Sequence, residues 1–508
     1  MFAGLAEVES RRTRDACSTY FESLNKLAGL IDQQASHFRT NSTLPAIYTY
    51  FGQFVNHDLS APVATPTYLK SITDKAAVSS VNQTDVVTAG PDAVALMSSE
   101  RPPNPQWLVN NILNQHPEPL CLYSLYGTGP SSDNSDIREL YDPATMKFRL
   151  GQTFDDPERP QAELDKMLRH DLLRNPDLRI ADRRNDENVI LSQLYLALML
   201  FHNQAIDVLK PKFSDAMKLF NEARNQITRH YQYCIVHDFL KKLVPDEAAG
   251  QQVQLTQKSA VPFEFTTAAF RFGHSMISES YDYNRFFGDG GIESEIATLR
   301  NLFEFTTRGK MGNTTHAQNK QLPTHWVIDW ARFFKVANTG NSGADQIDLV
   351  LPPTMTSLGD VTTNVKMADG LASISYRNLR RGYHRFMPSG QDMARKLNIE
   401  PLTPAQIGSA FTHHSATDVL RETGFDVKTP PWVYFLCEAK VKADGNALGP
   451  AAGAIVRGTI MELLRLNPQS VLKCEGGRWT PEMSPLRLAS GGTIKDIKSL
   501  LQFAGVLG

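Results

Sequence analysis

Apolar residues recur at intervals of three and four along many segments of the chain, which is the spacing of one buried face of an α-helix. The clearest segments are residues 44–58, 186–209, 216–244, 265–280, 295–305, 403–411 and 451–465. Alternation of apolar and polar residues at every second position, the pattern of a half-buried strand, is rare and brief. The pattern therefore predicts a mainly α fold with few short strands.

The balance of apolar and polar residues barely changes over most of the length of the sequence. Residues 1–35 are predicted to form a polar, partly helical arm, and residues 36–508 one large helical domain. Proline and glycine clusters mark loops, for example at residues 102–105 and 127–130. Residues 60–100, rich in Ser, Thr, Val and Ala, are predicted to run irregularly over the surface.

Composition narrows the class of protein. The chain has 508 residues, of which 41% are hydrophobic and 21% charged, ordinary values for a packed globular body. With 52 basic and 54 acidic residues, it lacks the positive field that binding to a phosphate backbone requires. Nucleic acid is therefore not an expected partner.

The cysteines and the first residues bear on the cellular compartment. Five cysteines are scattered without a Cys-x-x-Cys pair, which argues against zinc and is typical of reduced, buried thiols. Residues 1–31 carry charges without an apolar core, so no signal peptide is predicted. Apolar runs such as residues 194–201 are shorter than the roughly 20 residues of a membrane-spanning helix. We expect a cytoplasmic protein without a transmembrane segment, and non-classical secretion stays open.

His57 is the first candidate for chemistry. Pro45 suits a first helical turn, and a helix running from it places Gln53 and His57 on one face, with Asp58 about 100° away. Taken alone, His57 is best interpreted as a hydrogen-bonded core histidine. In company with the residues below, a neutral imidazole can take a proton from bound peroxide and return it to the departing oxygen.

Arg184 is the second candidate. Arg184 and Glu187 are three residues apart, on one helix face, before a strongly apolar run. The simplest interpretation is a salt bridge between them at the start of a helix. In a peroxide-cleaving pocket, a fixed guanidinium would stabilise the negative charge that develops as the oxygen–oxygen bond breaks. Arg183 competes with Arg184 for that role.

His274 is a candidate iron ligand. Gly273 before it would let a bulky ligand come close. The second ring nitrogen of a haem-ligating histidine needs a partner, and the side-chain oxygen of Asn378 can accept a hydrogen bond from it. Arg381, on the same helix face as Asn378, could pair with a haem propionate. The alternative for this stretch is a solvated basic helix, which is the default expectation for three further arginines, Arg377, Arg380 and Arg385.

At these residues the chain resembles the animal-type haem peroxidases of the peroxidase-cyclooxygenase superfamily, particularly the bacterial members. The resemblance runs from about residue 36 to the end of the chain and also includes residues 378–388 and 449–468. It implies a helical haem peroxidase fold, haem b as the cofactor, and hydrogen peroxide with a small electron donor as substrates. The expected reaction passes through a ferryl intermediate and oxidises donors such as halides or phenols.

The resemblance also implies roles for individual residues. His57 is similar to the distal histidine, Gln53 to the distal-pocket glutamine and Arg184 to the distal arginine. His274 is similar to the proximal iron ligand, and Asn378 to its hydrogen-bond partner.

Around the haem edge the chain departs from mammalian members. Arg381 is similar to a propionate contact, and Glu187 stands where mammalian members have an esterified glutamate. Asn56 replaces the aspartate of their second ester, so at most one ester link, through Glu187, is expected. Asn188 replaces a methionine that forms a sulfonium link in one mammalian member, which argues against very strong halide oxidation.

Asp58 matches a calcium ligand of the family. The loop that supplies the other ligands holds Cys121 where a carboxylate is expected. Because calcium prefers several hard oxygen ligands, no family-type calcium site is expected, and Asp58 is predicted to cap or hydrogen-bond locally.

Arg271 separates two branches of the superfamily. The dioxygenases carry a radical-forming tyrosine three residues before the proximal histidine, and that position holds Arg271. Tyr281 and Tyr283 follow His274 and are interpreted as packing aromatics. The sequence therefore favours a peroxidase. A haem-dependent fatty-acid or secondary-metabolite oxygenase and a non-catalytic haem-binding protein remain as alternatives.

Overall fold

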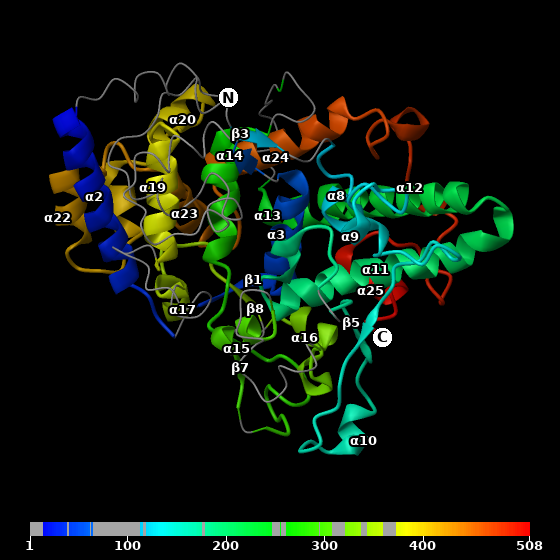
Figure 1. Ribbon diagram of the computed structural model, residues 1–508. Coiled ribbons are helices and arrows are strands. Elements are labelled where there is room, and N and C mark those ends of the chain that lie inside the picture. Colours follow the sequence, from blue (N-terminus) through cyan, green and yellow to red (C-terminus); the bar gives the residue numbers. More distant parts are fainter. Residues whose placement is uncertain are drawn as a thin grey trace.

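Helices dominate the computed structural model (Figure 1). The structure describes residues 14–37, 40–60, 62–64, 112–114, 118–174, 178–245, 255, 261–293, 295–306, 321–336, 343–358 and 372–508. The prediction of a mainly α protein with few short strands is confirmed. The stretch 60–100 and the proline loop at 102–105 lie almost wholly outside the described residues.

The α-helices are α2 (Arg14–Gln33), α3 (Ile47–Leu59), α8 (Tyr123–Tyr126), α9 (Ser135–Arg138), α10 (Gln161–Leu164), α11 (Val189–Leu209), α12 (Ala216–Cys234), α13 (Leu240–Leu243), α14 (Phe263–Thr267), α15 (Leu299–Glu304), α16 (Trp330–Phe333), α17 (Pro353–Thr356), α19 (Ile374–His384), α20 (Gly390–Lys396), α21 (Pro404–Ser409), α22 (Ala416–Thr423), α23 (Pro431–Ala443), α24 (Pro450–Leu466) and α25 (Ile497–Phe503). The 3₁₀ helices are η2 (Arg183–Asp186), η3 (Lys210–Lys212), η6 (Ala269–His274), η7 (Thr324–Trp326), η8 (Cys474–Gly477) and η9 (Pro481–Met483), and η4 (Ile235–Phe239) is a π-helix.

The described strands form four two-stranded antiparallel ladders. They pair β1 (Asn41–Pro45) with β8 (Gly343–Asp345), β2 (Pro62–Ala64) with β3 (Ile112–Asn114), β4 (Gly151–Gln152) with β5 (His170–Asp171), and β6 (Ser280–Tyr281) with β7 (Ala297–Thr298).

Two expected helices differ from the observed elements. Pro45 does not open a helix, because it ends β1, and α3 begins at Ile47. The helix expected over residues 265–280 is broken at Ala268, where the backbone leaves the helical region with φ −130° and ψ −66°. A short 3₁₀ helix, η6, follows the break and ends at His274.

The apolar helix α11 is a central element of the core. Most of its residues are buried, and α3, α12 and α25 pack against it. By length and composition, one stretch of the described chain, Val189–Lys212, could cross a membrane, but 83% of its most apolar window is buried inside the protein. Such burial is what a core helix of this composition shows.

The five cysteines are all free thiols, four of them buried and Cys121 partly so.

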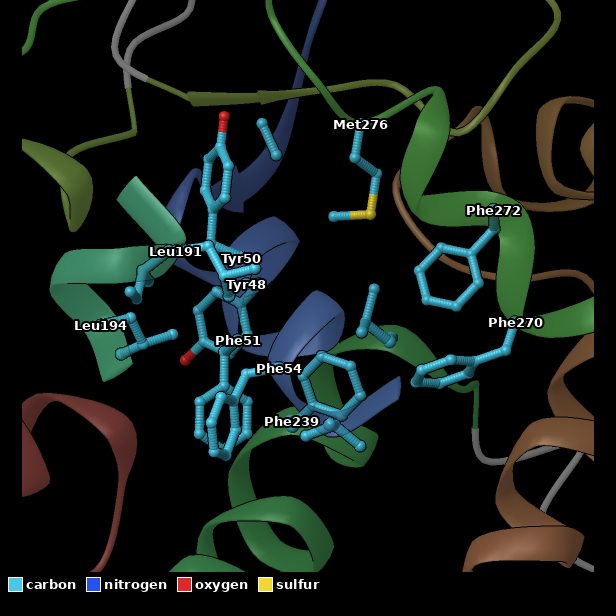
Figure 2. Close-up of a cluster of buried hydrophobic side chains, with 14 of the residues drawn as sticks. Tyr48, Tyr50, Phe51, Phe54, Leu191, Leu194, Phe239, Phe270, Phe272 and Met276 are labelled. Atoms are coloured by element: carbon cyan, nitrogen blue, oxygen red, sulfur yellow. The ribbon is translucent and has the colours of Figure 1, made fainter. Parts of the chain in front are cut away.

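Aromatic rings connect α3 to η6 (Figure 2). Phe51 of α3 packs against Phe239 of η4 with ring centroids 5.6 Å apart, and Phe239 meets Phe270 of η6 at 6.4 Å. Gly52 allows this approach, since a Cβ there would lie 3.1 Å from the Phe239 ring. Phe270 and Phe272 point from η6 toward α3 (Figure 2). The core thereby sets the spacing between the elements that carry His57 and His274.

The described part of the N-terminal segment packs closely on the rest of the molecule. The buried face of α2 lies against α19 (Figure 1). Arg380 of α19 donates to the side-chain oxygen of Asn25 at 2.9 Å and lies over the Phe21 ring at 4.8 Å.

The expectation of a solvated basic helix around Arg380 is wrong. Arg380 and Arg385 are both buried, and Arg385 donates to the Thr267 hydroxyl at 2.8 Å. Aromatic faces and hydrogen-bond acceptors replace water around these guanidinium groups, which lowers the free-energy cost of burying them.

His202 and His230 should make the fold sensitive to acid. Burial lowers the pKa of each to about 4, whereas an unfolded histidine titrates near 6.5. Between pH 6.5 and 4 the unfolded chain therefore binds protons that the folded chain does not, and stability falls as pH falls. Each ring can account for about 3 kcal/mol at most. Urea unfolding at several pH values measures the slope.

The control for this prediction is His230→Gln. Without the His230 ring, the number of protons taken up on unfolding should fall by up to one, and the slope of unfolding free energy against pH should fall in proportion. Comparing the two slopes removes the contribution of Glu438, whose burial raises its pKa to about 7 and acts in the opposite direction. Equal slopes for the two proteins would contradict the assignment.

Candidate active site

His57 lies in the last turn of α3, and its ring is oriented by an asparagine. Its Nδ1 is 2.9 Å from the side-chain oxygen of Asn185 in η2. An amide oxygen can only accept, so Nδ1 carries the proton and Nε2 keeps its lone pair. No described residue forms a hydrogen bond with Nε2.

The surroundings of His57 keep its ring neutral. Burial lowers the pKa of His57 to about 4, and the positive charge of Arg184 acts in the same direction. Glu187, Asp182 and the hydrogen bond that His57 donates to Asn185 oppose the shift but are outweighed. At neutral pH the ring is therefore a base with an available lone pair.

Arg184 ties η2 to the end of α3. Its guanidinium donates to the backbone oxygens of Ser60 at 2.7 Å and His57 at 2.9 Å, and to the Asp182 carboxylate. Those two oxygens belong to the last turn and cap of α3, where carbonyl groups lack helical partners. The salt bridge expected between Arg184 and Glu187 is replaced by the pair with Asp182. Arg183 is exposed.

Gln53 is also held by an asparagine. Its side-chain oxygen accepts from Asn188 at 3.2 Å, and Asn188 caps α11 by accepting from the backbone N–H of Leu191 at 2.8 Å. Asn56 is partly buried on the same helix, one residue before His57. Glu187, also partly buried, follows η2 directly.

His274 ends η6, and its Nδ1 lies 2.9 Å from the side-chain nitrogen of Asn378 in α19. The side-chain oxygen of Asn378 accepts from Arg381 at 3.0 Å. This corrects the expectation that the amide oxygen accepts from the imidazole. Arg381 can only donate, so it takes the oxygen and turns the amide nitrogen toward His274.

The sequence analysis missed the contacts that Asn185 and Asn188 make in the site. Asn188 stands directly before an apolar run, the usual position of a helix cap, and that signal could have assigned its structural role. Asn185 offers no such signal, because its contact joins residues 128 positions apart.

His57 and His274 share a pattern that sets them apart from two structural histidines. His202 and His230 use both ring nitrogens in hydrogen bonds with protein atoms. The rings of His57 and His274 are each held at Nδ1 by an asparagine, and no described residue bonds to Nε2 of either. The elements that carry them, α3 and η6, pack against each other.

Two further observations fit a large planar group with a metal at its centre. A Cβ at Gly273, beside His274, would meet no atom within 4 Å, so there is open space at this position. The side-chain nitrogen of Asn185 is buried and has no hydrogen-bond partner among the described residues, which is rare for a polar atom in a protein core. With the Asn378 nitrogen donating to Nδ1, the ring proton of His274 is on Nε2, so haem iron could bind at Nε2 only after that proton has moved to Nδ1.

Asp58 bonds to a loop on the other side of α3. Its carboxylate accepts from the backbone N–H groups of Leu122 at 3.0 Å and Ser124 at 3.1 Å, and from the Ser124 hydroxyl at 3.2 Å. The described residues contain no group of three or more His, Cys, Asp or Glu side chains suited to a metal ion.

Arg271 and the tyrosines after His274 have structural contacts. Nε of Arg271 donates to the backbone oxygen of Thr266 at 2.8 Å. Tyr281 accepts a hydrogen bond from Tyr50 at 3.0 Å, and Tyr283 donates to the backbone oxygen of Trp326 at 2.7 Å. Both tyrosines are buried, as packing aromatics are.

The family model of the animal haem peroxidases matches residues 25–319, more than half of the chain. The chain belongs to the animal haem peroxidase family. The matched range includes His57, Arg184 and His274 and ends before Asn378. This family membership confirms the resemblance.

Similar proteins include peroxidases and dioxygenases. Peroxidase mlt-7 of Caenorhabditis elegans is 28% identical over 152 residues, which cover 26% of this chain and about a fifth (21%) of the nematode protein. Peroxidase A of Dictyostelium discoideum has a TM-score of 0.56 at 14% identity, over 93% of this chain and 90% of that one. The fatty acid alpha-dioxygenase of Oryza sativa has a TM-score of 0.52 at 10% identity, over 93% and 75%. At these identities the likeness to the two structures shows a shared fold and nothing further.

His274→Ala should abolish haem binding, because it removes the imidazole lone pair. The haem-to-protein ratio and the Soret band of the purified variant measure the loss. Added imidazole should restore part of the Soret band by entering the space left by the side chain. His414→Ala, at an exposed histidine, is the matched control and should keep its haem. Full haem content in His274→Ala would contradict the assignment.

Proposed function

We propose that this animal haem peroxidase reduces hydrogen peroxide and oxidises a small electron donor, with His274 as the iron ligand and His57 as the acid/base group. One observation carries the proposal: two imidazoles, each held at Nδ1 by an asparagine with Nε2 unpartnered among the described residues, lie on adjoining elements. Haem, when bound, supplies the two electrons that break the peroxide bond.

His57 moves the proton. Its neutral Nε2 takes a proton from one oxygen of hydrogen peroxide and delivers it to the other oxygen, which leaves as water. Asn185 supports both stages, because its oxygen holds Nδ1–H and stabilises the ring when Nε2 is protonated. The reaction then takes two electrons from the donor and two protons from solution, and yields two waters in all.

Arg184 supplies positive charge beside His57. Four of its five N–H donors are engaged by Asp182, Ser60 and His57, which fixes the guanidinium in place. A fixed cation stabilises a developing negative charge without reorganising during the reaction. Arg184 therefore both orders the end of α3 and favours charge separation at the peroxide.

His274, Asn378 and Arg381 are the residues that would hold the haem opposite His57. If Nε2 of His274 held the iron, the ring proton would be on Nδ1, which would then need an acceptor. A half-turn of the Asn378 amide presents its oxygen to Nδ1, and a haem propionate is the anion that would draw Arg381 from that oxygen. Glu187 is the side chain that would form a single ester.

The deciding experiment compares peroxide with oxygen as the oxidant. Purified haem protein should oxidise a phenolic donor with hydrogen peroxide and should consume no oxygen with fatty acids alone. His57→Ala should keep the Soret band and lose peroxide turnover by about 10²–10⁴-fold, because the proton-transfer group is gone. Oxygen uptake with fatty acids, without added peroxide, would instead indicate an oxygenase. Retained turnover in His57→Ala would overturn the role of His57.

The reaction with peroxide should tolerate acid. Because the pKa of His57 is lowered to about 4, the basic form predominates above that pH and the rate of the first step should stay level there. Below about pH 4 the rate should fall as Nε2 is protonated, about tenfold per pH unit. Stopped-flow measurement of the haem spectrum after mixing with peroxide tests this. His57→Gln should be slow and independent of pH, whereas an inflection near pH 6.5 in the wild type would contradict the lowered pKa.

A further inference from the structure

Next to the site lies a buried ion network that the chemistry above does not use. Arg174 donates through Nη1 and Nη2 to the two carboxylate oxygens of Asp186 at 2.9 and 2.7 Å, and through Nε to Asp171 at 3.1 Å. The side chains of Arg174 and Asp171 are each 4% exposed, and that of Asp186 is 0% exposed. Two carboxylates and one guanidinium are thus enclosed together.

Such an arrangement is expensive to bury. Removing charges from water costs more than their attraction returns in many proteins, and apolar replacements of similar volume are often as stable. Burial raises the pKa of Asp171 even though Arg174 opposes the shift. Stability is therefore a poor explanation for the network. What distinguishes the network is that it fixes an orientation. Two parallel N–H···O hydrogen bonds hold the planar guanidinium of Arg174 against the planar carboxylate of Asp186.

The network is anchored to the β4–β5 ladder. Asp171 belongs to β5 and also accepts from the backbone N–H groups of Leu172 at 2.7 Å and Leu322 at 2.9 Å. The neighbouring strand β4 packs tightly there, because a Cβ at Gly151 would lie 2.2 Å from the backbone oxygen of Leu172. Arg174 thus holds Asp186 to a ladder outside the haem-facing elements α3 and η6.

The other side of η2 faces His57. Asp186 and Asn185 are consecutive in a 3₁₀ helix, where neighbouring side chains point about 120° apart. One side chain points to Arg174 and the other to Nδ1 of His57. Because η2 has only four residues, holding Asp186 also restricts the position of Asn185.

We propose that Arg174 and Asp186 are positioning residues for the acid/base histidine, holding η2 so that the Asn185 oxygen stays on Nδ1 of His57. The inference rests on the proposed function of His57. Neither residue is among those proposed above to contact peroxide or haem. They act through Asn185, and the chain of contacts runs from β5 through η2 to α3.

The experiment is a double-mutant cycle on the haem protein. Asp186→Asn replaces one acceptor oxygen with a donor group, so the paired bonds from Arg174 can no longer both form. Asn185→Ala removes the contact with His57. Two rates are measured for each variant: the reaction with peroxide, and the association of hydrogen cyanide, which also needs a base to take its proton but involves no turnover.

We expect each single variant to slow both rates by about tenfold, as for other residues that orient a reacting side chain. The double variant should be no slower than Asn185→Ala, because Asp186 acts through Asn185. Effects that multiply in the double variant, or normal rates in Asp186→Asn, would overturn the proposal.

Two further variants separate positioning from general damage. Asp282→Asn breaks another Asp–Arg pair, between the buried Asp282 and the partly buried Arg332, and should lower thermal stability while leaving both rates unchanged. Arg174→Lys keeps the positive charge but loses the paired bonds, so it should slow both rates and carries the test if Asp186→Asn fails to fold. Normal rates in Arg174→Lys would count against the proposal.

The two hypotheses fail in different ways. If the wild-type haem protein does not react with peroxide, the proposed function is wrong, whereas the cyanide rates still report on the base. If the wild type reacts and the cycle shows no coupling, the function stands and the positioning role fails.

Discussion

A neutral imidazole has one donor and one acceptor, so whatever binds Nδ1 decides what Nε2 can do. The site depends on this constraint twice. Asn185 accepts a hydrogen bond from Nδ1–H of His57, so Nε2 of that ring stays basic. The Asn378 amide instead presents its nitrogen to His274, because Arg381 donates to its oxygen. Neither ring is adjusted by a neighbouring carboxylate in direct contact with Nδ1. Amides orient the rings without adding charge to a low-dielectric interior.

Most of the contacts described around His57 and Gln53 are made by the segment 182–188. Within it, Arg184 binds the end of α3, Asn185 binds the ring of His57, and Asn188 binds Gln53. A 3₁₀ helix suits this task, because its tight turn sends successive side chains in different directions. Because the turn is tight, displacing one residue of the segment would also displace its neighbours. Its placement therefore matters more than the strength of any single contact within it.

The sequence predicted the fold class and the long helices because their apolar positions recur at helical spacing over many residues. It predicted η6 poorly, since the apolar run continues through the break at Ala268 and only tertiary packing against α23 and α24 shows where the helix stops. The basic stretch around Arg380 was expected in water. Nothing local announces that Phe21 and Asn25 of α2, some 350 positions away, supply its surroundings.

The candidate site shows the same division. His57, His274 and Asn378 were singled out from residue type and order, and the structure brings each histidine to an asparagine on another element. Asn185 could not be found, because an amide in a charged run has many ordinary uses. Arg184 was paired with the wrong carboxylate, since Asp182 and Glu187 are both within reach along the chain and only the fold decides between them. The periodicity of apolar residues within one element predicts its secondary structure. The geometry of a catalytic site depends on contacts between elements, and a single sequence contains little information about those contacts.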